Sequence, residues 1–172
     1  MKIKFSGVPV AEDIFSLDDV KEHLRVEHTE EDDLITGIRA AAISYAEEYC
    51  SIKLGSYAAT GYLDNFENSI IPVGPVNSLT AVNYKAVGYT QDLSTLDFTK
   101  YFTDLDTTPN RICFVNVPSL AQYQLNRVQI TMGVGYTTGV VPAAIIAAVK
   151  LLCGHLYENR QAETFNLMPY AL

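Results

Sequence analysis

The chain has 172 residues, of which 48% are hydrophobic and 19% charged, and its formal net charge is −8. This composition is typical of a globular protein with one core and argues against disorder, while the lack of any Lys/Arg run argues against a protein that grips nucleic acid through its phosphates. The acidity belongs to the first third, since residues 1–50 hold 12 acidic and 5 basic side chains whereas residues 141–172 hold two of each.

The cysteines and the apolar segments narrow the class of protein further. The three cysteines form no C-x-x-C pair, which argues against a disulfide framework and against a Cys-based zinc site. The longest apolar stretch, residues 140–157, is interrupted by Pro142 and Lys150, so we expect no membrane span. No apolar segment of signal-peptide length precedes Gly7, and we expect a soluble, intracellular protein.

Helical patterns begin after residues 1–15, which are predicted to form an extended arm. Ser16 followed by Asp19 is a capping-box pattern, and the apolar spacing after it predicts a short helix that ends near Arg25. Thr29 followed by Asp32 repeats that signal. The apolar period of residues 34–49 then predicts a second helix of about five turns.

The middle of the chain is rich in β-branched and aromatic residues in short runs. Turn-forming pieces separate these runs and no helical pattern lies between them, which predicts short antiparallel strands. The predicted strands are residues 57–63, 69–73, 79–84, 98–102, 111–115 and 128–134.

The last third returns to a helical pattern. Pro142 is tolerated at a helix start, and a helix is predicted from residue 143 to about residue 159. It is apolar over more than the usual third of its circumference, which implies burial on two sides, either in a core or in a subunit contact. The tail, residues 161–172, is apolar without a period, and this leaves two readings open: a docking segment, or packing on its own domain.

These elements predict an α+β fold in a single domain of residues 1–172. We expect a small antiparallel helical bundle, built from two N-terminal helices and the C-terminal helix, with an inserted antiparallel β region. The expected parts are an arm (1–15), helices (16–51), a β-rich region (52–140), a C-terminal helix (141–160) and a docking tail (161–172).

Candidate catalytic and metal-binding patterns have simpler explanations. Four of the carboxylates in residues 27–33 fall in the first turn of a helix, where they offset its dipole. Asp104 and Asp106 resemble the start of a calcium loop, but its sixth position is Pro109 and its twelfth is Val115. The glycines of residues 133–139 do not fit a dinucleotide fingerprint and are better explained by a bend between strand and helix. We expect no enzyme activity, no metal and no cofactor.

Four segments, taken in order, resemble the phage head–tail connector family, also called head completion or adaptor proteins. They are SLDDVKEHLRV at residues 16–26, EDDLI at residues 31–35 with the Ala-rich helix after it, IPVGPVNSLTAV at residues 71–82, and the stretch from VGY at residue 134 to LYENR at residue 160. Residues 1–15 and about 87–126 are extra relative to compact members.

The resemblance implies a structural role. Family members assemble into a ring beneath the capsid portal, which extends the DNA channel and offers a platform for tail attachment. The implied partners are other copies of the chain in a closed ring of about twelve, the portal protein, and a tail or stopper protein. Double-stranded DNA would pass through without sequence-specific binding. The implied location is the virion, with the host cytoplasm before assembly.

Two sets of residues are the expected contact sites. The expected subunit interface lies on the two long helices and consists of Leu34, Ile38, Tyr45, Tyr49, Ile145, Val149, Leu152 and Leu156. The expected portal-docking residues are Phe165, Leu167, Met168, Tyr170 and Leu172. Alternatives to the connector ring are a non-ring virion or tail-interface component and a small enzyme with a site near residues 104–111.

Overall fold

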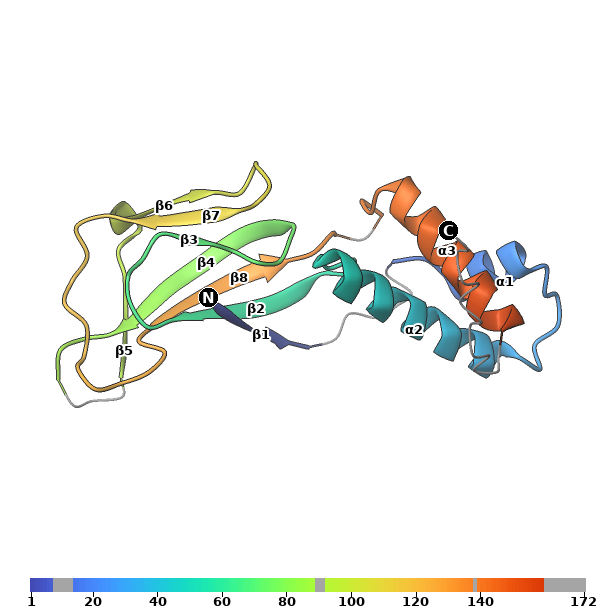
Figure 1. The fold of residues 1–172 in the computed structure, drawn as a ribbon, viewed down its shortest axis with the longest axis horizontal. Coiled ribbons are helices and arrows are strands. Elements are labelled where there is room, and N and C mark those ends of the chain that lie inside the picture. The colour runs from blue at the N-terminus through green and yellow to red at the C-terminus, as the bar shows by residue number, and fades with distance from the viewer. Residues whose placement is uncertain (8–13, 89–91, 138, 160–172) are drawn as a thin grey trace, which may run out of the picture.

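A computed structural model describes residues 1–7, 14–88, 92–137 and 139–159. The molecule is elongated, with the strands gathered in a β lobe at one end of the long axis and the helices in a helical lobe at the other (Figure 1). Each lobe has its own cluster of buried apolar side chains.

The main sheet of the β lobe has five antiparallel strands in the order β1-β2-β8-β4-β5. Their bounds are β1 Lys2–Ser6, β2 Tyr57–Leu63, β4 Val76–Lys85, β5 Leu93–Thr95 and β8 Val128–Val134. The alternation along β8 explains its central place: Val128, Ile130, Met132 and Val134 are fully buried, and the residues between them are half-buried.

A second sheet of three strands packs against the same core. It has the order β3-β7-β6, with β3 Ser69–Ile70, β6 Tyr101–Asp104 and β7 Arg111–Phe114, and a 3-10 turn, η2 Phe98–Lys100, leads into β6. Phe66 joins the two sheets, because its ring lies 5.7 Å from that of Tyr84 on β4 and 5.2 Å from that of Phe114 on β7.

The helical lobe consists of α1 Leu17–Leu24, α2 Asp32–Cys50 and α3 Ala143–Glu158. The capping box forms as expected at α1, where Ser16 Oγ accepts from Asp19 N and the Asp19 carboxylate accepts from Ser16 N. The helices α2 and α3 run antiparallel, as Figure 1 shows. Their contact buries Ile35, Ala42 and Ile43 of α2 with Val149 and Cys153 of α3.

The lobes are joined by a dense set of polar contacts around Glu47 near the end of α2. Glu47 is 5% exposed, and its carboxylate accepts hydrogen bonds from Lys53 Nζ at 2.7 Å, Leu54 N at 2.8 Å and Tyr57 Oη at 2.9 Å. Burial, followed by the hydrogen bond to Glu47, raises the pKa of Tyr57 above its ordinary value. Because three donors bind one buried carboxylate, they fix the orientation of the C-terminal end of α2 relative to the sheet.

Gly135 lies where the chain passes from the β lobe back to the helical lobe, between β8 and α3. Its φ is +101°, and a Cβ built on it would lie 1.8 Å from Gly55 O, so neither the conformation nor the space admits a side chain. This confirms the interpretation of this glycine as the bend between the last strand and the C-terminal helix.

Replacing Glu47 with alanine is expected to lower the free energy of unfolding by about 2–4 kcal/mol, because it leaves the Leu54 amide, the Tyr57 hydroxyl and the Lys53 ammonium without their acceptor. Chemical denaturation measures this loss. The matched control is Glu48→Ala, since Glu48 is exposed and the change there should stay within about 0.5 kcal/mol. Equal effects of the two changes would contradict the role given to Glu47.

The expected α+β class, with three helices and antiparallel sheets, is confirmed. Several details differ. The helix start expected at Thr29 is not a capping box, since α2 begins at Asp32 with Glu31 as its N-cap and no side-chain cap bond. Residues Lys2–Ser6 of the predicted arm form β1, which pairs with β2 at the sheet edge.

The strand predicted for residues 69–73 covers only Ser69–Ile70. The predicted strand at residues 98–102 begins instead as η2, because the Asp97 side chain caps that turn by accepting from Thr99 N. The short strand β5 carried no prediction. The single-domain organisation stays a prediction.

Candidate functional site

An apolar groove runs along the seam between α2 and α3. It consists of two pockets placed end to end. One, of about 350 Å³, is lined from α2 by Tyr45, Tyr49 and Cys50 and from α3 by Ala144, Ala148 and Leu152. The other, of about 520 Å³, is lined by Asp33, Leu34, Gly37, Ile38, Ala41, Leu156 and Asn159. One helical turn separates the pockets on each helix, from Ala41 to Tyr45 and from Leu152 to Leu156.

Two tyrosines dominate the rim of the groove. Tyr45 is 60% exposed and Tyr49 81% exposed, and their rings stack at 6.1 Å with an interplanar angle of 11°. They stand one turn apart on α2, so the stack follows from their i, i+4 spacing. Tyrosine combines a large apolar ring with few rotatable bonds, which makes it a preferred residue at the centre of protein–protein contacts.

The outer face of α3 extends the apolar surface beyond the groove. Its first turns expose Ala143, Ala144, Ala147 and Ala148, and Leu151 is 66% exposed. The Lys150 ammonium, on the inner side, bonds Asp19 of α1 at 3.2 Å. A helix that is apolar around most of its circumference is normally covered on more than one side, and the described part of the chain covers only the side that faces α1 and α2.

The structure brings together the eight residues expected at the subunit interface. Three line one pocket (Leu34, Ile38, Leu156) and five line the other (Tyr45, Tyr49, Ile145, Val149, Leu152). Their shares of the surface differ, however. Val149 is 2% exposed and belongs to the core between the helices, which leaves it almost no surface to offer to another chain. The role of the others as an interface stays a prediction.

The portal-docking prediction is not tested by the structure, and some exposed apolar residues of α3 were not predicted. The portal-docking residues Phe165, Leu167, Met168, Tyr170 and Leu172 lie outside the described residues. The exposed position of Leu151 was missed, because the pattern placed it at the margin of the buried stripe. Ala144 and Ala148 were missed as well, since small apolar residues carry little signal in a helical pattern.

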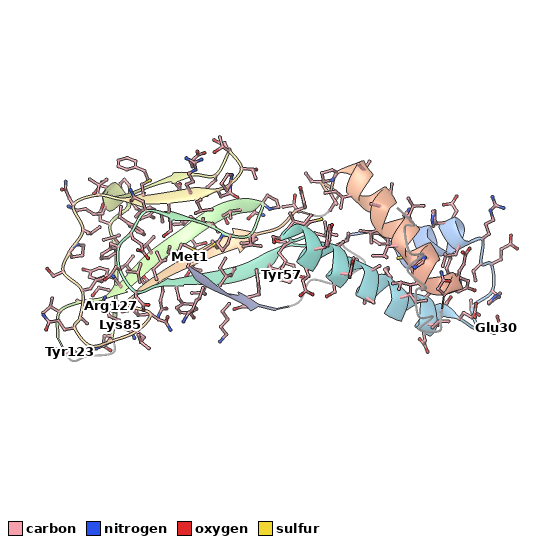
Figure 2. All side chains as sticks on the ribbon, viewed as in Figure 1. Met1, Glu30, Tyr57, Lys85, Tyr123 and Arg127 are labelled. Carbon is pink, nitrogen blue, oxygen red and sulfur yellow. The ribbon has the colours of Figure 1, made fainter. Side chains whose placement is uncertain are left out.

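Charge is distributed unequally between the two lobes. The described residues of the helical lobe (14–51 and 141–159) hold 11 acidic and 4 basic side chains, whereas those of the β lobe (1–7, 52–88 and 92–137) hold 6 and 7. Figure 2 shows Glu30 at one end of the long axis and Tyr123 and Arg127 at the other. Among these described residues, neither lobe has the strong excess of cations that would hold DNA by its phosphates.

The region around residues 104–111, the candidate for an enzyme site, forms a turn. Asp104 accepts hydrogen bonds from Thr107 Oγ1 at 2.5 Å and Thr107 N at 3.3 Å, and the side-chain bond holds the pKa of Asp104 below its ordinary value. Both acceptor oxygens thus serve the turn itself. Within the described ranges, no group of three or more His, Cys, Asp or Glu side chains lies close enough to hold a metal ion.

Among the helices of the described residues, none combines the length and the apolar character needed to cross a bilayer.

Comparison with known protein families gives a match in the first half of the chain. Residues 14–92 match the model of the phage gp6-like head-tail connector proteins. The match confirms the family resemblance over α1, α2 and the strands up to β4, just under half of the chain. This connector family is a structural family, not a family of enzymes. A search of curated protein sequences found no match.

Comparison with solved structures extends the likeness to the whole fold. A chain in the neck of an empty gene transfer agent (GTA) particle, computed with C6 symmetry, gives a TM-score of 0.79 at 21% identity, covering 99% of this chain and 91% of that one. A chain in the virion of a native GTA particle gives a TM-score of 0.77 at 20% identity, covering 99% of this chain and 91% of that one. A chain in the neck of a native GTA particle, computed with C12 symmetry, gives a TM-score of 0.77 at 19% identity, covering 99% of this chain and 90% of that one. At these identities the likeness concerns the fold.

Proposed function

We propose that this chain is a head–tail connector subunit of a phage or phage-derived particle. It forms a closed ring beneath the portal, extends the DNA channel and carries the platform for tail attachment. The observation that supports the proposal most strongly is the agreement of two findings: the connector family model matches residues 14–92, and the whole fold resembles chains from particle necks.

The groove between α2 and α3 supplies one of the contact surfaces that such a ring needs. A closed ring is built from heterologous contacts, so each subunit must present two different faces to its neighbours. Exposed apolar patches on soluble proteins mark interaction sites. We assign the groove, with Tyr45, Tyr49 and the outer face of α3, to one side of the contact between neighbouring subunits.

The expected partners follow from the ring. Its members are copies of this chain, about twelve by analogy with the C12 neck, and its neighbours are the portal protein and a tail or stopper protein. DNA passes through without being held, in keeping with the acidic helical lobe and the nearly neutral β lobe. The subunit works in the virion and occupies the host cytoplasm before assembly.

Native mass spectrometry of the purified protein, alone and mixed with the portal protein of the same particle, tests the proposal. The expected product in the mixture is a complex of one portal with a closed set of copies of this chain. A strict monomer that ignores the portal would overturn the proposal. A single copy per portal subunit without contacts between copies would favour a non-ring component.

Removing residues 165–172 is expected to abolish association with the portal, because the portal-docking residues lie in this segment. The three helices of the described residues should be retained, since they lie within residues 17–158. Co-sedimentation with the portal measures the association and circular dichroism the helix content. Normal association of the truncated chain would exclude this segment as the docking element.

A further inference from the structure

A second apolar surface lies on the β lobe, on the outer face of the three-stranded sheet β3-β7-β6. The register places Phe102 opposite Cys113 and Ile70 opposite Arg111. These four residues share one face of the sheet, because Arg111 and Cys113 stand two positions apart on β7. Ile112, which lies between them, is fully buried on the other face. The face that carries Phe102 therefore points away from the core.

The apolar side chains of this outer face are strongly exposed. Phe102 is 64% exposed and Ile70 56%, and Phe98, on the turn η2 that leads into β6, is 77% exposed. Val115 follows Cys113 by two positions and extends the same face by one row, with 41% of its surface exposed. Exposed apolar residues gathered in this way mark an interaction site. The β-lobe patch is defined here as Ile70, Phe98, Phe102, Cys113 and Val115.

The charges beside the β-lobe patch are opposite in sign to those around the α2–α3 groove. Arg111 is exposed on the face of the patch, and Lys100 is half-buried at its margin. Asp104, which lies opposite Arg111, uses its carboxylate oxygens within its own turn. The groove belongs to the lobe with 11 acidic and 4 basic described side chains, where Asp33 lines a pocket and Glu48 is exposed on α2.

We propose that the β-lobe patch of one copy occupies the α2–α3 groove of the next copy in the ring. This inference deepens the proposed function and rests on it, because it names the second of the two faces that a closed ring requires. The two surfaces belong to different lobes of the subunit, as a head-to-tail contact demands (Figure 1). Two grooves placed against each other would instead bring two acidic lobes together and would give a closed pair.

The dimensions of the two surfaces are compatible. The outer face of the small sheet extends about 14 Å along residues 100–104 and about 10 Å across its three strands. The groove follows α2 from Asp33 to Cys50 for about 25 Å, at 1.5 Å per residue. The patch therefore fits within the length of the groove. Its two phenylalanines would lie in the pocket of about 350 Å³ that Tyr45 and Tyr49 line.

Two native cysteines report on this contact without any substitution. Cys50 is exposed and lines the groove, Cys113 is exposed in the β-lobe patch, and Cys153 is buried. In rings assembled on the portal, a short bismaleimide cross-linker is expected to join Cys50 of one copy to Cys113 of the next. A denaturing gel should show a ladder of multimers, and peptide mapping identifies the joined residues.

The variants Cys50→Ser and Cys113→Ser are the matched controls. Each variant alone should lose the ladder, whereas an equal mixture should give cross-linked dimers and nothing larger, because each chain then carries only one of the two exposed thiols. Rings that join Cys50 to Cys50, or Cys113 to Cys113, would overturn the proposal in favour of like surfaces in contact. Rings without any cross-link between Cys50 and Cys113 would overturn it in favour of another surface. A failure to form rings would contradict the proposed function, and this contact with it.

Replacing Phe102 with glutamate tests the patch by its effect on assembly. The yield of rings on the portal is expected to fall at least about tenfold, because a carboxylate would enter an apolar groove in an acidic lobe. The melting temperature of the subunit should stay unchanged, since Phe102 is largely exposed. The matched control is Tyr123→Glu, at an exposed aromatic residue outside the patch, which should form normal rings. A normal yield from Phe102→Glu would contradict the proposal.

Discussion

Replacing Tyr45 and Tyr49 together with alanine is expected to abolish ring assembly on the portal while leaving the fold intact. Both rings stand on the rim of the groove and are largely exposed in the subunit. Central tyrosines of an interface commonly contribute 2 kcal/mol or more each, so the pair should weaken each contact by more than about a hundredfold. Because every contact between neighbouring subunits in a ring uses the same residues, each of these contacts would lose this affinity.

The stability of the subunit should change by less than about 1 kcal/mol, because the rings are exposed and alanine favours the helix. Electron microscopy with the portal measures assembly, and thermal unfolding measures stability. The matched control is Tyr123→Ala, which removes a ring that is 94% exposed at the opposite end of the molecule. Normal rings from the double variant would remove the groove from the subunit contact.

Replacing Val149 with aspartate is expected to cost about 4 kcal/mol or more of the free energy of unfolding. Val149 lies in the helical core against α2, and a carboxylate there would be buried without a partner. Leu151 stands two residues further along the same helix and is exposed, so Leu151→Asp should change stability by less than about 0.5 kcal/mol.

The Leu151→Asp variant should nevertheless weaken ring assembly, since it places a charge on the apolar outer face of α3. Chemical denaturation of both variants, with portal binding of the second, measures these effects. If the two substitutions destabilised the chain equally, the orientation of α3 in the structure would be wrong.

The elements that could be predicted from the sequence are those with strong local signals. The strands at residues 57–63 and 128–134 match β2 and β8, since β2 contains Tyr57, Thr60 and Tyr62 between turns and β8 alternates large apolar residues with Gln129, Thr131 and Gly133. The helix predicted for residues 34–49 matches α2 within two residues. In these cases the local pattern and the burial in the fold agree.

The elements that escaped prediction depend on tertiary contacts. The five residues of β1 become a strand because the edge of β2 is available to pair with them. Residues Leu93–Thr95 form β5 only through pairing with Asn83–Lys85 on β4. Residues Lys2–Ser6 do alternate polar and apolar side chains, which is a strand signal that the prediction of an arm did not use, whereas Leu93–Thr95 is too short to show an alternation.

The groove between α2 and α3 could be predicted in outline. Apolar positions at helical spacing identified the two helices whose seam forms the groove, and the eight expected residues all line it. The pattern could not separate Val149, which faces the core, from Leu151, which faces outward, because both are apolar. Only the packing of α1 and α2 against α3 assigns these two faces.

The most direct test of the ring proposal is a cryo-electron microscopy reconstruction of this protein bound to its portal. The predicted result is a closed ring in which the groove, with Tyr45, Tyr49 and Leu151, is buried between neighbouring subunits, and in which residues 165–172 contact the portal. A portal complex in which the groove of each subunit faces solvent would contradict the proposed contact. A portal that binds no copy of this chain would contradict the connector function itself.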